Sequence, residues 1–184
     1  MRRKPRESGE ANGSHEEKKS PLVGIVMGSD SDLPVMEEAE RILEQFQVPY
    51  EVTLSSAHRS PDRTHRYTMS AEEKGLEVII VGAGAAAHLA GVIAAKTTLP
   101  VIGVPIDSSP LKGMDSLLST VQMPGGVPVA TMAVGRAGAR NAAILAVQIL
   151  ALKYPRLKGA LKGYKKRLEK EVEEKAKRIR RESM

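Results

Sequence analysis

The chain has 184 residues, of which 41% are hydrophobic, so it is long enough for one domain that buries a full core. It contains no cysteine, which excludes a disulfide framework and a thiolate metal site or nucleophile. No apolar run approaches the roughly 20 residues of a membrane-spanning helix, and the N-terminal segment lacks the apolar centre of a secretory signal. These features favour a cytoplasmic enzyme without a membrane partner.

The net charge of +6 is concentrated at the two ends of the chain. Residues 1–20 carry a net charge of +2 and residues 153–184 a net charge of +8, whereas residues 21–152 carry a net charge of −4. The chain has four Tyr, one Phe and no Trp, so it offers few aromatic rings for stacking on bases. Because the basic charge is not interleaved with aromatic residues, we expect no nucleic-acid partner.

Five short apolar or alternating segments are separated by segments with helical spacing. The first of them, Leu22–Met27, is apolar throughout, which is typical of a strand buried on both faces. Regular alternation of strand and helix predicts a parallel sheet with helices on both sides. We therefore expect an α/β fold, a three-layer, doubly wound, five-stranded parallel sheet. The expected strands are 22–27, 50–54, 77–81, 99–106 and 127–134, and the expected helices are 33–46, 61–74, 114–123 and 136–152.

Composition divides the chain into three parts. Residues 1–20 are polar and aperiodic and are expected to form a disordered tail, residues 21–155 the catalytic α/β domain, and residues 156–184 a charged, extended C-terminal helix. Within the domain, Arg136–Leu152 is apolar on nearly all sides, which favours packing against other subunits. The C-terminal helix carries a narrow apolar stripe that fits the same purpose.

The loop Gly28–Asp32 follows the first strand and precedes the first helix. Its serines and aspartates, together with the amides at a helix N-terminus, suit a phosphate or a hydroxyl-rich ligand. Asp32 has an alternative role as the helix N-cap, and Asp30 fits a solvent-exposed position equally well.

The loop between Leu54 and Pro61 places His58 beside Arg59. Imidazole transfers protons near neutral pH, and guanidinium holds an anion in a fixed geometry. After the third strand, Gly82–Gly91 is built of small residues that allow a close approach of backbone and ligand, with His88 as its one polar side chain. Since the carboxyl ends of parallel strands meet at one edge of the sheet, the three loops are expected to share one pocket.

The pocket residues lack the motifs of nucleoside triphosphate and dinucleotide sites, and the two histidines have no carboxylate partner at metal-ligand spacing. What remains is a histidine that transfers protons, an arginine that holds an anion, and Ser and Asp side chains that bind hydroxyl groups. This set predicts acid–base chemistry on a small phosphorylated molecule, without metal or cofactor.

Four motifs together carry a family resemblance. They are Met27-Gly-Ser-Asp-Ser-Asp32, Ser56-Ala-His-Arg59, Gly82-Ala-Gly with Ala87-His-Leu89, and Asp115-Ser-Leu with Val121-Gln-Met-Pro124. In this order and spacing they resemble the N5-carboxyaminoimidazole ribonucleotide mutases of purine biosynthesis, and the match covers about Leu22–Pro155. The resemblance implies a flavodoxin-like subunit in a homo-octamer that needs neither metal nor cofactor.

The resemblance also implies a reaction and a role for each site residue. The carboxylate on the exocyclic nitrogen of the ribonucleotide leaves as carbon dioxide, which the ring carbon then captures to give 4-carboxy-5-aminoimidazole ribonucleotide. His58 transfers the proton between nitrogen and carbon. Because carbon dioxide carries no charge, we further expect that an apolar wall of Ala and Gly at Gly82–Leu89 confines it. Ser29, Asp32 and Arg59 bind the ribose phosphate, and Ser31, Ser56, Ala83, Gly84, His88 and Leu89 complete the pocket.

Two alternative functions stay open. A related branch of aminoimidazole ribonucleotide carboxylases uses free carbon dioxide and carries lysine after the motif histidine, so Arg59 favours the mutase. A catalytically silent nucleotide-binding or assembly protein is the second alternative, and His58 argues against it. The chain departs from the family pattern at Ala85, where glycine is expected, and at Ala90, where proline is expected.

Overall fold

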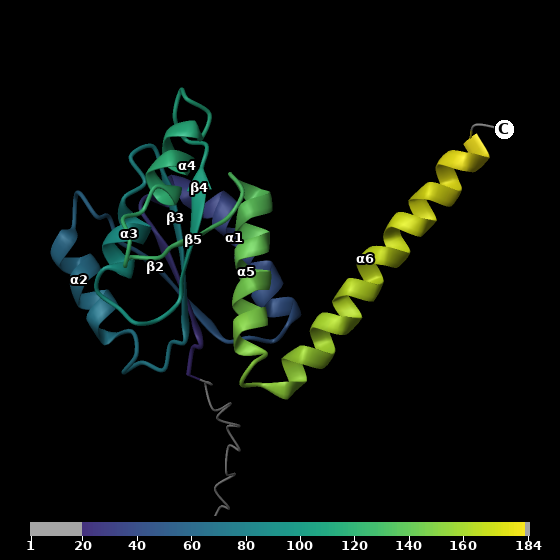
Figure 1. Cartoon of the computed structure of the whole chain (residues 1–184), viewed down its shortest axis with the longest axis horizontal. Coiled ribbons are helices and arrows are strands. Elements are labelled where there is room, and N and C mark those ends of the chain that lie inside the picture. Colours follow the sequence, from purple (N-terminus) through teal and green to yellow (C-terminus); the bar gives the residue numbers. More distant parts are fainter. Residues whose placement is uncertain (1–19, 183–184) are drawn as a thin grey trace, which may run out of the picture.

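Five parallel strands form the centre of the computed structural model, which describes residues 20–182 (Figure 1). The strand order β2-β1-β3-β4-β5 means that the chain runs outward from β1 in one direction and then in the other, which is the doubly wound arrangement that the sequence predicts. The tail expected at residues 1–20 lies outside the described residues, except for residue 20. The strands are β1 (Val23–Met27), β2 (Tyr50–Leu54), β3 (Val78–Gly84), β4 (Val101–Ile106) and β5 (Ala130–Thr131).

Helices cover both faces of this sheet, so the three-layer fold is confirmed. Helices α1 and α5 pack against each other on one face, and α2, α3 and α4 lie on the other (Figure 1). A short 3-10 helix, η1, precedes α1. The helices are η1 (Asp30–Asp32), α1 (Leu33–Gln45), α2 (Pro61–Ser70), α3 (Leu89–Ala94), α4 (Met114–Val121), α5 (Arg136–Leu150) and α6 (Pro155–Glu182).

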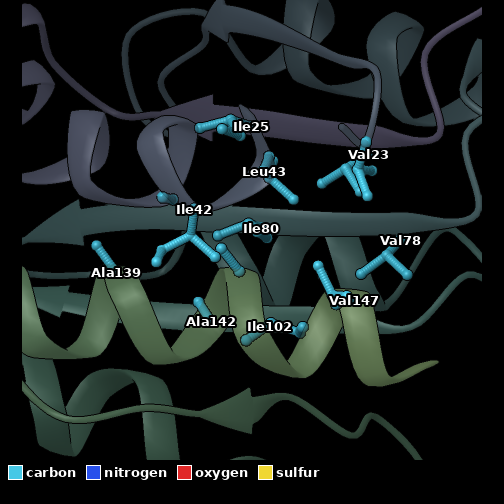
Figure 2. Close-up of a cluster of buried hydrophobic side chains, with 14 of the residues drawn as sticks. Val23, Ile25, Ile42, Leu43, Val78, Ile80, Ile102, Ala139, Ala142 and Val147 are labelled. Atoms are coloured by element: carbon cyan, nitrogen blue, oxygen red, sulfur yellow. The ribbon is translucent and has the colours of Figure 1, made fainter. Parts of the chain in front are cut away.

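The core is made by side chains that alternate between the two faces of the sheet. All five residues of β1 are buried, as expected for a strand covered on both sides. Val23 and Ile25 belong to the cluster that includes α1 and α5, whereas Val26 belongs to the cluster under α2 and α3. Figure 2 shows the first cluster, in which the small side chains Ala139 and Ala142 let α5 approach the strands.

Helix α5 differs from the sequence prediction. One of its faces is buried within its own chain, and its exposed positions are mostly polar, while Ile144, Leu145 and Ile149 are half-buried, so the helix is amphipathic rather than apolar on all sides. The guanidinium groups of Arg136 and Arg140 lie 3.3 and 2.8 Å from the carboxylate of Glu38 on α1. Arg41 of α1 approaches the same carboxylate at 2.7 Å. This carboxylate, in a side chain that is only 9% exposed, therefore connects the two helices.

We expect Glu38→Gln to lower the melting temperature at pH 7 more than Glu37→Gln, whose carboxylate is exposed and pairs with Arg41 alone. The hydrogen bond from Arg140 holds the pKa of Glu38 below its ordinary value of 4.5. A lowered pKa contributes stability that is present above the ordinary value and is lost as the pH falls through the folded-state value. Thermal unfolding between pH 7 and 3 should show the difference between Glu38→Gln and wild type shrinking below about pH 4.5. A difference that does not change with pH would contradict this account.

Three further elements, β5, α3 and β3, differ from expectation. Strand β5 has two residues rather than eight, and pairs with β4 only at Ala130 and Thr131. Pro128 has no N–H to donate to a ladder, which accounts for the late start of the pairing. Helix α3 was not expected, because Leu89–Ala94 is small and apolar without a polar periodicity. Strand β3 extends through Gly84, so residues expected in a loop continue the sheet.

Helix α6 begins on the core and then leaves it (Figure 1). Leu157 is fully buried, and the ring of Tyr164 packs against Phe46 at a centroid distance of 5.6 Å. Further along, Val172 and Ile179 are 66% and 61% exposed. The apolar stripe expected on this helix thus packs against its own chain over the first half only.

Candidate active site

Three loops meet at the carboxyl ends of β1, β2 and β3, around a cavity of about 380 Å³. The register places Met27 and Leu54, the last residues of β1 and β2, level with Gly82, and β3 continues two residues further to Gly84. The loop after β4 adds Ser108, which the sequence analysis did not select. Nine of the ten expected site residues line the cavity: Ser29, Ser31, Asp32, Ser56, His58, Arg59, Ala83, Gly84 and Leu89. The tenth, His88, contacts His58 directly.

The first loop is held together by its own side chains. Ser29 caps η1, and its hydroxyl accepts hydrogen bonds from the amide and the hydroxyl of Ser31 at 3.4 and 2.9 Å. Asp32 stands at the N-cap position of α1 but makes no side-chain cap there; instead its carboxylate accepts the N–H of Ser29 at 3.0 Å. Burial raises the pKa of Asp32, which is 3% exposed. Asp30 is exposed and accepts the amide of Ser31.

The second loop is fastened to the first through Arg59. Its Nη2 donates to the carbonyl oxygen of Gly28 at 3.2 Å, which joins the loops after β2 and β1. Within the loop, the hydroxyl of Ser56 accepts the N–H of Arg59 at 3.2 Å, and Ser60 in turn accepts the N–H of Ser56 at 3.0 Å. The Arg59 guanidinium, which has further N–H donors, is therefore fixed beside the serines of the first loop and is available to an anion.

The two histidines of the site form a direct pair. Nε2 of His58 and Nδ1 of His88 lie 2.9 Å apart, and the rings meet edge to face, with an angle of 85° between their planes. One nitrogen donates and the other accepts, so the tautomer of one ring fixes that of the other. His88 stands just before α3, in the third loop, so the pair connects loops that are 30 residues apart in sequence.

The end of β3 and the third loop provide a wall of small residues. Gly84 has no room for a side chain, because a Cβ atom there would overlap with the hydroxyl of Ser108. Ala85 has a φ of 49°, in the left-handed region that favours glycine. The departure from the family pattern noted at Ala85 therefore falls on a strained backbone position that lines the cavity.

We expect Ala85→Gly to relieve this strain and to raise the free energy of unfolding by up to about 1 kcal/mol, after the entropy gained by the unfolded chain is subtracted. Ala86→Gly is the matched control, since Ala86 has no positive φ and should lose about 0.4–1 kcal/mol. Chemical denaturation of both variants measures the difference. Equal destabilisation by the two substitutions would contradict the inference of strain.

The arrangement combines three chemical abilities in one cavity. Arg59 and the amides and hydroxyls of the first loop suit a phosphorylated ligand, and the imidazole pair can accept and return a proton. The Ala and Gly residues of the third loop offer an apolar surface next to His58. Ser108 shares this wall, and the rule that carboxyl-end loops converge at the switch in strand order would have found it from its place after the fourth strand.

Comparisons with known proteins agree with this architecture. A family model described as AIR carboxylase matches residues 22–171. The N5-carboxyaminoimidazole ribonucleotide mutase of Pyrococcus horikoshii is 64% identical over 159 residues, which are 86% of this chain and 89% of that protein.

The chain belongs to the AIR carboxylase family. The resemblance that the four sequence motifs indicate is thereby confirmed.

Two other members of the comparison are informative. The phosphoribosylaminoimidazole carboxylase of Schizosaccharomyces pombe is 54% identical over 160 residues, which cover 87% of this chain but only 29% of that longer protein. The crystal structure of Treponema denticola PurE superposes with a TM-score of 0.75 at 26% identity, covering 84% of this chain and 95% of that one. Across residues 20–182, no helix has both the length and the apolarity that crossing a membrane requires.

Proposed function

We propose that the chain converts N5-carboxyaminoimidazole ribonucleotide into 4-carboxy-5-aminoimidazole ribonucleotide, as a mutase of de novo purine biosynthesis. The observation that carries the proposal is the contact between His58 and His88 at the cavity formed by the loops after β1, β2 and β3. The chain that contains this pair is 64% identical to a protein named as this mutase. The product keeps every atom of the substrate, so the enzyme is an isomerase.

His58 is the catalytic acid and base of this reaction. Cleavage of the carbamate C–N bond leaves its electron pair on the exocyclic nitrogen, which takes a proton from the His58 imidazolium. The ring carbon then attacks the released carbon dioxide, a C–C bond forms, and His58 removes the proton that this carbon carried. His88, at 2.9 Å, fixes the ring orientation and tautomer of His58.

The remaining residues bind the substrate and confine the intermediate. Arg59, Ser29 and Asp32 hold the ribose phosphate part, with Ser31 and Ser56 beside them. Ala83, Gly84 and Leu89 form the apolar side of the pocket, where an uncharged molecule such as carbon dioxide loses no strong hydration on entry. Side chains thus supply proton transfer, anion binding and confinement, and we propose that the enzyme works without metal or cofactor.

The enzyme is further proposed to act in the cytoplasm as a homo-oligomer, with the octamer as the assembly implied by the family. His58, His88 and Ala86 are all exposed in the single chain, so a neighbouring subunit is needed to keep carbon dioxide from water. Residues 21–155 form the catalytic unit in this proposal, and residues 156–184 its helical extension.

Helix α4 and the turn before it provide an apolar surface for assembly. Four large apolar side chains on this surface, Leu111, Met114, Leu118 and Val121, are 64%, 57%, 49% and 49% exposed.

A carboxylase that uses free carbon dioxide is the second candidate, favoured by the 54% identity to the Schizosaccharomyces pombe protein. We expect the purified chain to form product faster from the carbamate substrate than from aminoimidazole ribonucleotide with bicarbonate.

His58→Asn should lower turnover at least about 100-fold, because general acid–base catalysis contributes that much or more. His65→Asn, at an exposed histidine of α2 outside the cavity, is the control and should stay fully active.

Efficient use of low bicarbonate would instead identify the carboxylase. Full activity of His58→Asn would contradict both candidates and revive the reading as a catalytically silent nucleotide-binding protein.

A further inference from the structure

A second polar groove lies between the edge strand β2 and the helix α2. It has a volume of about 370 Å³, within the range of small-molecule sites, and shares no lining residue with the cavity of the candidate active site. Residues 51–53 of β2 form one side of the groove, and α2 with Lys74, which follows it, forms the other. The active-site loop leaves β2 at its last residue, Leu54. Its main polar residues are Glu51, Thr53, Arg63, Arg66, Tyr67 and Lys74.

Positive charge dominates this groove, which we call the β2–α2 groove. Arg63 donates from Nε to the carbonyl oxygen of Leu54 at 2.7 Å and from Nη2 to the hydroxyl of Thr53 at 3.2 Å, so its guanidinium is held in place. Arg66, one residue before Tyr67, makes no hydrogen bond or ion pair with any residue in the described range 20–182. A fixed and an unpaired guanidinium together suit a doubly charged oxyanion such as a phosphate monoester.

Lys74 and Glu51 stand opposite each other in the same groove. The ammonium of Lys74 lies 3.3 Å from the Glu51 carboxylate and 4.7 Å from the centre of the Tyr67 ring. This pair neutralises itself, so Arg63 and Arg66 leave a net positive charge for a ligand. The carboxylate also has free acceptor capacity, which suits the hydroxyl groups of a sugar.

Tyr67 lies under the groove and faces Glu51. Its side chain is 8% exposed, and its hydroxyl is buried against Gly24, where a Cβ atom would overlap with it. Gly24 is the register partner of Glu51, and burial, together with the charge and hydrogen bonding of Glu51, raises the pKa of Tyr67. The hydroxyl therefore stays a neutral donor beside the Glu51 carboxylate, and the Tyr67 ring reports on any ligand that changes the surroundings of Glu51 and Lys74.

We infer that the β2–α2 groove binds the phosphate group of a small phosphorylated molecule that carries hydroxyl groups. Arg63 and Arg66 hold the phosphate, and Glu51 accepts from a hydroxyl of the same ligand. The groove is much larger than one phosphate ion, so a sugar phosphate fits it better than phosphate alone. The inference does not depend on the proposed function, because the two sites share no residue.

The test uses the full chain labelled with ¹³Cζ-tyrosine, which gives four resonances from Tyr50, Tyr67, Tyr154 and Tyr164. Tyr67→Phe assigns the resonance of interest. Ribose 5-phosphate is the probe, inorganic phosphate tests the phosphate part, and ribose is the uncharged control. Arg59→Ala serves as the background that weakens anion binding in the candidate active site, so that the groove is observed by itself.

Saturable movement of the Tyr67 resonance with ribose 5-phosphate, weaker movement with phosphate and none with ribose would support the inference. Arg66→Gln should lower the affinity at least about tenfold, since it removes a charge-assisted contact, whereas Arg180→Gln on α6 removes the same charge elsewhere and should leave it unchanged.

A Tyr67 resonance that does not move with ribose 5-phosphate would overturn the inference. So would equal weakening by Arg66→Gln and Arg180→Gln, since binding would then reflect overall charge rather than this groove.

Discussion

The contact between His58 and His88 depends on the register of three parallel strands. Met27 and Leu54, the last residues of β1 and β2, are level with Gly82, and β3 ends two residues later at Gly84. From there His58 and His88 reach each other with nitrogen atoms 2.9 Å apart. A shift of one strand by a residue would move its loop by about 3.3 Å, more than a hydrogen bond tolerates. The burial of β1 on both faces holds this register, and the contact between the two histidines is its consequence.

The loops themselves are stiffened by short-range contacts rather than by burial. Arg59 joins the second loop to the first through the carbonyl of Gly28, and Asp32 holds the amide of Ser29. The third loop accepts a residue in an unfavourable conformation, Ala85, and leaves no space beside Gly84. Such a site is preorganised, because its side chains hold their positions before a ligand binds. Proton transfer between fixed atoms requires this.

The sequence predicted the features that follow from repetition and from local chemistry. Apolar runs bounded by turn residues located the first four strands, and the rule on carboxyl-end loops brought nine of the ten site residues to one cavity and His88 to its edge. The boundaries of the last strand were missed because its pairing is set by a neighbour, β4, and by Pro128. Helix α3 was missed because Leu89–Ala94 has no polar face.

Side-chain contacts between distant segments were beyond the reach of the sequence. Nothing in the pattern of α5 indicates that Arg136 and Arg140 meet Glu38 across about 100 residues, so that helix was read as an assembly surface. The groove lined by Glu51, Arg63 and the unpaired Arg66 likewise exists only once β2 and α2 lie together. The family relationship adds the chemistry that neither propensity nor spacing could give, namely the carboxylated imidazole ribonucleotide.

The central claim is that the carbon dioxide released from the substrate stays in the site and is captured by the same molecule. The direct measurement supplies substrate with ¹³C in the carbamate carboxylate, in a buffer that contains unlabelled bicarbonate, and follows the label into the product by mass spectrometry. The account predicts that product formed in a single turnover keeps nearly all of the label. Product whose carboxylate has the isotope composition of the buffer would contradict it.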